Sequence, residues 1–116
     1  MSLKLKRAYD APSKDDGCRI LVDRLWPRGL RKAEARIDLW LKELAPSTAL
    51  RKWFAHDPAR WQEFQKRYFA ELDGRAALVE DLRKRTAGGL VTLVYGAKDE
   101  THNHAAALKD YLSRPT

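Results

Sequence analysis

Short apolar runs alternate with helical stripes along this chain, and this alternation constrains the fold more than any other feature of the sequence. Residues 90–95 combine high β-propensity with a glycine on each side, which predicts a buried strand. Residues 19–23 form a second apolar run with β-branched members, which is typical of a central strand. Strands separated by helices pair in parallel through right-handed crossovers. We therefore expect a mainly parallel short sheet with helices on both faces, a Rossmann-like three-layer α/β arrangement.

Weaker patterns predict the remaining elements. Residues 3–7 alternate leucine with lysine, the period of a half-buried edge strand, and residues 37–44 follow a similar but imperfect alternation that predicts another strand. Ser47 and Asp57 are expected to be helix N-caps, with Pro58 at the first helical position after the second cap. Helices are expected over residues 32–36, after Ser47, after Asp57 as far as Leu72, and over 75–85 and 101–113, with a frayed end at 114–116.

Length and composition limit the class of protein. A chain of 116 residues suffices for one hydrophobic core, so residues 1–116 are expected to form a single α/β domain. Cys18 is the only cysteine, which excludes an internal disulfide and a Cys-rich zinc site. No apolar run approaches the ~20 residues needed to cross a bilayer, and the first ten residues are too charged for a secretory signal. We therefore expect a cytoplasmic protein without a membrane partner.

Positive charge is concentrated in the first third of the chain. The whole sequence has 23 Lys and Arg against 16 Asp and Glu, a net charge of +7. Residues 1–36 hold ten of the basic and five of the acidic residues, which gives +5 for this third alone. A local excess of this kind indicates a pocket or patch for an anion, and the alternative is a solvated basic face without a ligand.

The first polar loop at a strand end is rich in groups that bind anions. Ligands of parallel sheets bind outside the carboxyl ends of the strands, and Asp23, Arg24, Trp26 and Arg28 follow the strand predicted at residues 19–23. Arginine forks match carboxylate or phosphate oxygens, and tryptophan offers a flat face for stacking. The alternative is an internal ion pair between Asp23 and an arginine, with Trp26 filling the core.

Two further loops are expected at the same edge of the sheet. Ser47 is either a plain helix N-cap or a hydroxyl that faces an anion, and no Gly-x-Ser-x-Gly elbow surrounds it. Lys98 and the start of the last helix are suited to a phosphate, and Asp99 and His104 are the candidates for proton transfer. Asn103 stands beside them as a further candidate ligand-binding side chain.

No cofactor or metal is expected. Gly96 is isolated, so neither a P-loop nor a dinucleotide fingerprint is present. His102 and His104 diverge once the chain becomes helical, and zinc usually requires three or four protein ligands. The aromatic residues between Trp53 and Tyr68 recur at helical spacing, which favours core packing over base stacking. His56 more often satisfies backbone groups than acts as a catalyst.

A resemblance to a known family is carried by residues 19–29, 44–47 with 50–54, 56–58, and 93–99 with 103–105. They closely resemble the YeaO-like branch of the domain-of-unknown-function 488 family, and the resemblance covers nearly the whole chain. It implies a compact α/β fold in bacteria and no assigned activity. Longer relatives carry Cys-His-Arg where this chain has Asn103, His104 and Ala105, so the resemblance implies no cysteine nucleophile here.

These observations predict a domain that binds an anionic small molecule, phosphorylated or nucleotide-like, at the carboxyl ends of its strands. Arg24 and Arg28 would hold the anion, Lys98 would add charge and Ser47 would donate a hydrogen bond. Whether acid–base chemistry follows is left open. The alternative is a nucleic-acid-binding or regulatory module whose basic first third contacts the phosphate backbone. The first hypothesis requires Arg28, Ser47 and Lys98 to lie on one rim.

Overall fold

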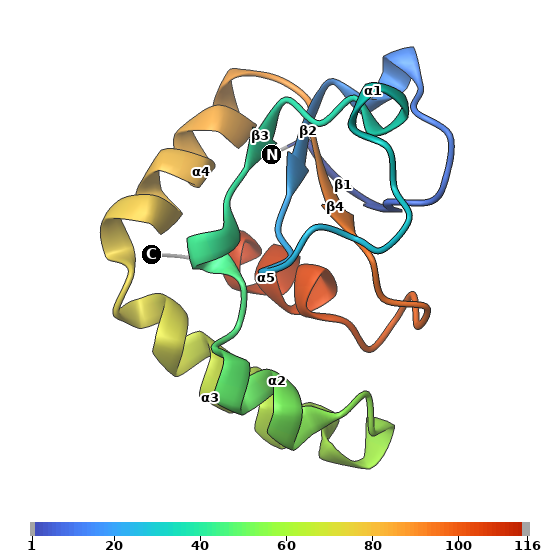
Figure 1. The fold of residues 1–116 in the computed structure, drawn as a ribbon. Coiled ribbons are helices and arrows are strands. Elements are labelled where there is room, and N and C mark those ends of the chain that lie inside the picture. The colour runs from blue at the N-terminus through green and yellow to red at the C-terminus, as the bar shows by residue number, and fades with distance from the viewer. Residues whose placement is uncertain (1, 115–116) are drawn as a thin grey trace.

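Four parallel strands form one sheet in the computed structural model, which describes residues 2–114 (Figure 1). The sheet has the order β1-β4-β2-β3, and every neighbouring pair is parallel, as the sequence predicts. The predicted edge position of the first strand is also confirmed. The frayed end expected at 114–116 lies almost wholly outside the described residues. The strands are β1 (Leu3–Arg7), β2 (Cys18–Leu21), β3 (Leu39–Trp40) and β4 (Val91–Tyr95).

Ser47 and Asp57 are both N-caps, as the sequence predicts, Ser47 of an α-helix and Asp57 of the 3-10 turn Pro58–Arg60. Ser47 Oγ accepts a hydrogen bond from the Leu50 N–H at 3.1 Å, and the Asp57 carboxylate accepts from the Ala59 N–H at 3.0 Å. Both side chains satisfy N–H groups that the first helical turn leaves without a partner. The helices are α1 (Lys32–Ala35), α2 (Thr48–Phe54), α3 (Trp61–Asp73), α4 (Ala76–Gly88) and α5 (His104–Ser113), with 3-10 turns at Lys14–Asp16, Lys42–Leu44 and Pro58–Arg60. No helix within residues 2–114 is long and apolar enough to span a membrane.

The strand predicted over residues 37–44 is wrong beyond Trp40. Only β3 pairs with β2, and the chain then turns into the 3-10 segment Lys42–Leu44. β2 itself ends at Leu21. The Leu21 carbonyl accepts a backbone hydrogen bond from the Leu41 N–H at 2.9 Å, just after β3 ends. The turn buries Leu44 completely in the main core, so burial of this side chain outweighs continued pairing.

One face of the sheet packs against α2 to α5 and forms the main core (Figure 1). α3 contributes Phe64, Tyr68 and Leu72, each no more than 2% exposed, so the apolar stripe expected on this helix is confirmed. Each such side chain contributes roughly 1.5–3 kcal/mol by leaving water. The Tyr68 hydroxyl donates to the Leu44 carbonyl at 2.6 Å, which satisfies the polar end of a fully buried ring.

The opposite face of the sheet has a thinner cover. Ala8, Leu21 and Val94 form a small buried cluster there, with Trp26 and Trp40 packed against it. The covering segment is the chain between β2 and β3, whose only helix is the single turn α1. The α/β fold class is thus confirmed, and a loop with one helical turn builds the layer on this face.

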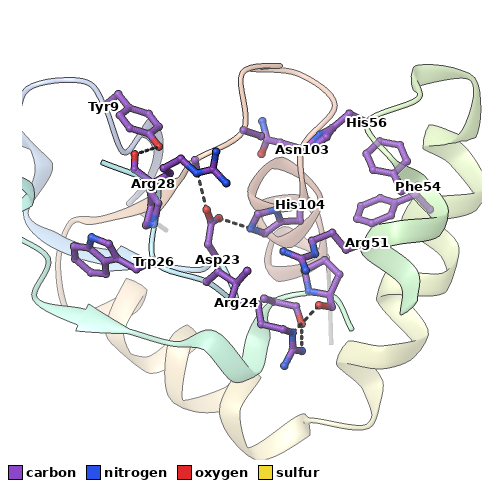
Figure 2. Close-up of a pocket in the computed structure, with 17 residues that line it drawn as sticks. Tyr9, Asp23, Arg24, Trp26, Arg28, Arg51, Phe54, His56, Asn103 and His104 are labelled. Carbon is purple, nitrogen blue, oxygen red and sulfur yellow. Dashed lines mark hydrogen bonds and ion pairs between the residues drawn. The ribbon is translucent and has the colours of Figure 1, made fainter. Parts of the chain in front are cut away.

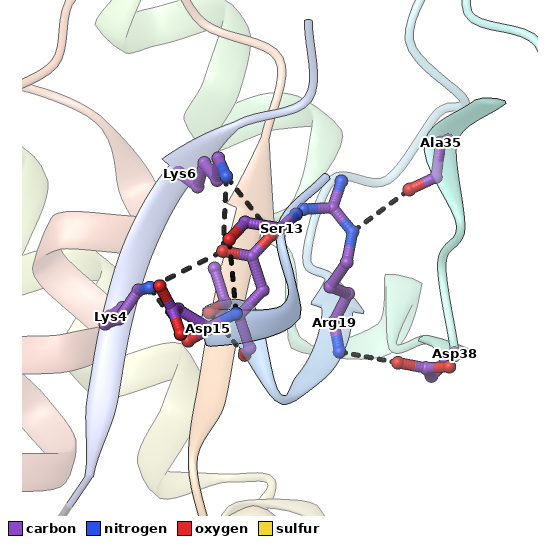
Figure 3. A network of polar contacts seen from close by, with 9 residues as sticks. Lys4, Lys6, Ser13, Asp15, Arg19, Ala35 and Asp38 are labelled. Atoms are coloured by element: carbon purple, nitrogen blue, oxygen red, sulfur yellow. Dashed lines mark hydrogen bonds and ion pairs between the residues drawn. The ribbon is translucent and has the colours of Figure 1, made fainter. Parts of the chain in front are cut away.

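The lysines of β1 point toward a buried carboxylate on this second face (Figure 3). Asp16 has no exposed side-chain surface, and its oxygens lie 2.7 Å from Arg19 Nη1, 3.2 Å from Lys6 Nζ and 3.5 Å from Lys4 Nζ. Burial raises the pKa of Asp16, but the Ser13 N–H, Lys6 and Arg19 together outweigh burial and lower this pKa from 3.8 to about 2. Three of the ten basic residues in the first third therefore belong to a structural network.

Candidate functional site

A cleft of about 470 Å³ opens at the carboxyl ends of the strands. The segments that follow β2, β3 and β4 meet there with α2 and the start of α5, which is the edge where parallel sheets bind ligands. Its lining includes the polar side chains of Asp23, Arg24, Arg28, Arg51, Asn103 and His104. Five of these six were expected from the sequence, and Arg51 was not.

Asp23 and His104 meet at the floor of the cleft (Figure 2). Asp23 Oδ2 accepts a hydrogen bond from the Gly96 N–H at 2.9 Å, and Oδ1 lies 2.9 Å from His104 Nε2. A Cβ at position 96, just after β4, would stand 2.8 Å from Asp23 Oδ2, so a larger residue there would displace this carboxylate. The internal Asp23–arginine ion pair considered from the sequence is not formed, since Asp23 pairs with His104.

Asn103 holds the start of α5 in place. Its Oδ1 accepts from the Ala106 N–H at 2.8 Å and its Nδ2 donates to the Asp99 carbonyl at 2.9 Å. The side chain is 2% exposed, and these two bonds make it the N-cap of the helix. Asn103 therefore positions His104, the first residue of α5, at the cleft.

Arg24 ties two loops of the cleft together. Its Nε donates to the Pro46 carbonyl and its Nη2 donates to the Ala45 carbonyl, both at 3.2 Å. Ala45 and Pro46 line the cleft on the segment between β3 and α2. The guanidinium thus supports the wall of the cleft and adds its charge there.

Arg28 and Arg51 occupy opposite sides of the cleft, with Asp23 and His104 between them (Figure 2). Both side chains are exposed, and neither guanidinium has a hydrogen-bond or ion-pair partner within residues 2–114. The backbone of Arg28 is fixed because its carbonyl accepts from the Tyr9 hydroxyl at 2.8 Å. The sequence does not predict a role for Arg51, because it lies among the apolar residues of a helical pattern. The signal for it is that α2 follows a loop at the strand ends, so the first turns of α2 lie beside the cleft.

Trp26 fills the second core more than it serves the cleft. Its Nε1 donates to the Leu30 carbonyl at 2.7 Å, and its ring meets Trp40 edge-on at 5.6 Å between centroids. This is the core-filling role that the sequence left open as an alternative. Trp26 is also one of the residues that line the cleft.

Ser47 is directed away from the cleft by a carboxylate on α3. Its Oγ donates to Glu71 Oε2 at 2.6 Å and its N–H donates to Glu71 Oε1 at 2.8 Å, in addition to the bond that caps α2. These bonds join α2 to α3 and leave no role for Ser47 in the cleft lining. The structure also keeps Lys98 out of that lining, so it does not bring Arg28, Ser47 and Lys98 together.

Asp99 organises the turn before α5 instead of lining the cleft. Its Oδ1 accepts from the N–H groups of His102 and Thr101, both at 2.9 Å, and its Oδ2 lies 3.0 Å from His102 Nδ1. The backbone bond from His102, followed by that from Thr101, holds the pKa of Asp99 well below its ordinary value. The His102 ring in turn meets Trp61 of α3 edge-on at 5.4 Å. Asp99 is therefore an ionised acceptor that shapes the turn.

Aromatic side chains form the apolar side of the cleft. Phe54 and Phe64 line it from α2 and α3, and the exposed His56 lies 6.3 Å from Phe54 between ring centroids. Ala55 and His56 both adopt left-handed backbone, with φ of 49° and 56°. Such backbone costs energy in non-glycine residues and is concentrated at functional sites.

No group of three His, Cys, Asp or Glu side chains in the described chain is placed to hold a metal ion.

The fold and cleft define a small parallel α/β domain with an open ligand-sized site at its strand ends. The chain belongs to the family described as the inactive DUF488-N3 subclade, whose model matches residues 2–116, and the resemblance expected from the sequence is confirmed. It is 44% identical to the uncharacterized protein Rv3073c of Mycobacterium tuberculosis H37Rv over 111 residues, 96% of this chain and 93% of that protein. It is 43% identical to the uncharacterized protein YeaO of Escherichia coli K12 over 115 residues, 97% of each chain. No solved structure matches the chain.

Proposed function

We propose that the cleft binds a phosphorylated small molecule, with the anion held between Arg28 and Arg51. The observation that carries this proposal is a pair of guanidinium groups on opposite sides of one cleft, both without protein partners among the described residues. Guanidinium forks match phosphate oxygens in two parallel hydrogen bonds. The lining holds three arginines against the single carboxylate of Asp23, a surplus of two positive charges that attracts anions.

The rest of the ligand is expected to carry a ring. Phe54, Phe64 and Trp26 present apolar surface to the cleft, and the volume of about 470 Å³ lies within the usual range of small-molecule sites. A ligand with a phosphate at one end and a sugar or base at the other fits this combination of charge and apolar surface. The proposed ligand is therefore nucleotide-like or sugar-like.

A binding role agrees better with the lining than covalent catalysis does. Cys18 is not part of the lining, and the Tyr9 hydroxyl at its edge is already bonded to the Arg28 carbonyl. Ser47 is engaged by Glu71. The described cleft thus offers no thiol or free hydroxyl as a nucleophile, and the description of the family as inactive agrees with a binding role.

Isothermal titration calorimetry with ribose 5-phosphate and adenosine 5′-monophosphate tests the proposal. Arg28→Ala and Arg51→Ala should each weaken binding by about ten- to a hundredfold, because each removes charge-assisted hydrogen bonds. Lys52→Ala and Arg31→Ala are matched controls, since both are exposed basic residues close in sequence that do not line the cleft. Equal binding by all four variants contradicts the proposal. Salt-sensitive DNA binding that is lost with other basic residues supports the nucleic-acid alternative.

A further inference from the structure

We infer that the floor of this cleft selects a hydroxyl group, so that the ligand is a hydroxylated phosphate ester of the sugar-phosphate class and not a bare oxyanion. The inference rests on the proposed function, because it assumes that Arg28 and Arg51 hold the phosphate. The group that makes the selection is His104, with Asp23 beside it.

The surroundings of His104 fix its tautomer. Nε2 lies 3.1 Å from the Val22 carbonyl oxygen and 2.9 Å from Asp23 Oδ1, and both of these oxygens can only accept. In a neutral imidazole one nitrogen carries the proton and the other accepts a hydrogen bond. When the ring is neutral, its proton is therefore assigned to Nε2, and Nδ1 is left as an acceptor.

Nδ1 is open to a ligand. Nδ1 has no hydrogen-bond partner within residues 2–114. It also keeps some solvent-accessible surface, unlike the fully buried unpartnered atoms Arg19 Nη2 and Asp23 Oδ1. The His104 side chain is 17% exposed and lines the cleft. Asp23 Oδ1, on the Nε2 side of the ring, is buried and has no well-directed hydrogen bond. The floor thus presents one open acceptor, Nδ1 of His104.

The charges and acceptors of the cleft place the phosphate and the hydroxyl of the ligand at different positions. A phosphate placed against the floor would face the negative charge of Asp23 and the acceptor Nδ1 of His104, so the anion belongs at the arginines on the walls. A hydroxyl on the same ligand supplies the proton that Nδ1 of His104 lacks. A phosphate ester without hydroxyls leaves this acceptor unpaired in a partly buried place, which is costly.

Calorimetry at pH 8 with a matched pair of ligands tests the inference. Ribose 5-phosphate carries ring hydroxyls, and cyclopentylmethyl phosphate has a ring of the same size without them. The wild-type chain should bind ribose 5-phosphate about tenfold more tightly or better, the value of one well-made hydrogen bond. Equal affinities overturn the inference and leave the proposed function standing. Failure of both ligands to bind overturns the proposed function and the inference with it.

His104→Leu removes the acceptor Nδ1 and replaces the imidazole by an apolar side chain of similar size. It should weaken ribose 5-phosphate binding about tenfold more than it weakens cyclopentylmethyl phosphate binding, and the binding of cyclopentylmethyl phosphate that remains shows that the variant is folded. Loss of both ligands to the same degree contradicts the inference. His104→Asn, which keeps an acceptor oxygen near the position of Nδ1, should restore part of the preference, and a preference no better than that of the leucine variant counts against it.

Proton uptake separates this role from a simple electrostatic one. Titrations in two buffers with different heats of ionisation should show no proton taken up when ribose 5-phosphate binds, because Nδ1 accepts its hydrogen bond from a hydroxyl. Uptake of about one proton would mean that His104 binds as a cation that holds the phosphate, and that result overturns the inference.

Discussion

Two carboxylates lie at opposite ends of strand β2, Asp16 before it and Asp23 after it. Asp16 has no exposed side-chain surface and is contacted by Lys4, Lys6 and Arg19. Asp23 is 18% exposed, lies against a single imidazole, and keeps Oδ1 without a well-directed hydrogen bond. The comparison shows that one end of the strand is closed by the chain's own cations, and the other is left open where a parallel sheet binds its ligands.

The largest effect should come from breaking the closed end. Asp16→Asn leaves the lysines without their counter-charge and leaves Arg19, which is 3% exposed, without its carboxylate partner. The free energy of unfolding should fall by about 3–5 kcal/mol, as for other buried pairs that lose one partner. Urea unfolding measures this loss, and Asp15→Asn, at an exposed neighbouring position, should change it by less than about 0.5 kcal/mol. A loss no larger than that of the control would show that the network does not stabilise the fold.

Acid should weaken the same network. The pKa of Asp16 is about 2 in the folded chain and 3.8 as an ordinary carboxyl. Because the folded value is the lower one, the stabilisation is fully present above pH 4 and is lost as the pH falls toward 2. It amounts to about 2 kcal/mol by linkage, and the wild type should lose most of this, relative to Asp16→Asn, when urea unfolding is compared at pH 5 and pH 2.5. Parallel losses in both proteins would assign the acid sensitivity to other groups.

Gly96→Ala breaks the open end. The added Cβ would stand 2.8 Å from Asp23 Oδ2, so the carboxylate must shift away from the Gly96 N–H and from His104. Stability should fall by about 1–2 kcal/mol, and ligand affinity should fall with it. Gly88→Ala is the matched control, because a Cβ there meets nothing within 4 Å. The control should be neutral or slightly stabilising in urea unfolding, and a cleft that binds equally well in both variants would contradict the role of Asp23.

The parts of the fold that the sequence predicts are those set by local chemistry. The strand at residues 90–95 and the caps at Ser47 and Asp57 follow from propensity and from backbone N–H groups that need acceptors. The strand predicted over 37–44 ends early because burial of Leu44 depends on helices that are distant in sequence. Local pattern does not report such contacts.

The candidate site divides in the same way. The position of Asp23, Arg28 and His104 in the cleft lining follows from the sequence, because they lie in the loop after a strand or at the start of a helix at the sheet edge. The absence of Ser47 from the lining does not, because Glu71, 24 positions later, takes its hydroxyl. The basic excess of the first third predicts an anion site, but Lys6 and Arg19 of that third form ion pairs with Asp16 and so do not serve the cleft.

Backbone amide shifts during a titration with ribose 5-phosphate test the central claim most directly. Assigned ¹H–¹⁵N spectra report which end of β2 responds to the ligand. We expect shifts at Arg28, Arg51, Gly96 and His104, with the amides of the Asp16 network unchanged. Shifts confined to Lys4, Lys6 and their neighbours, or no saturable shift at the cleft residues, would contradict the claim that the carboxyl end of the sheet is the binding site.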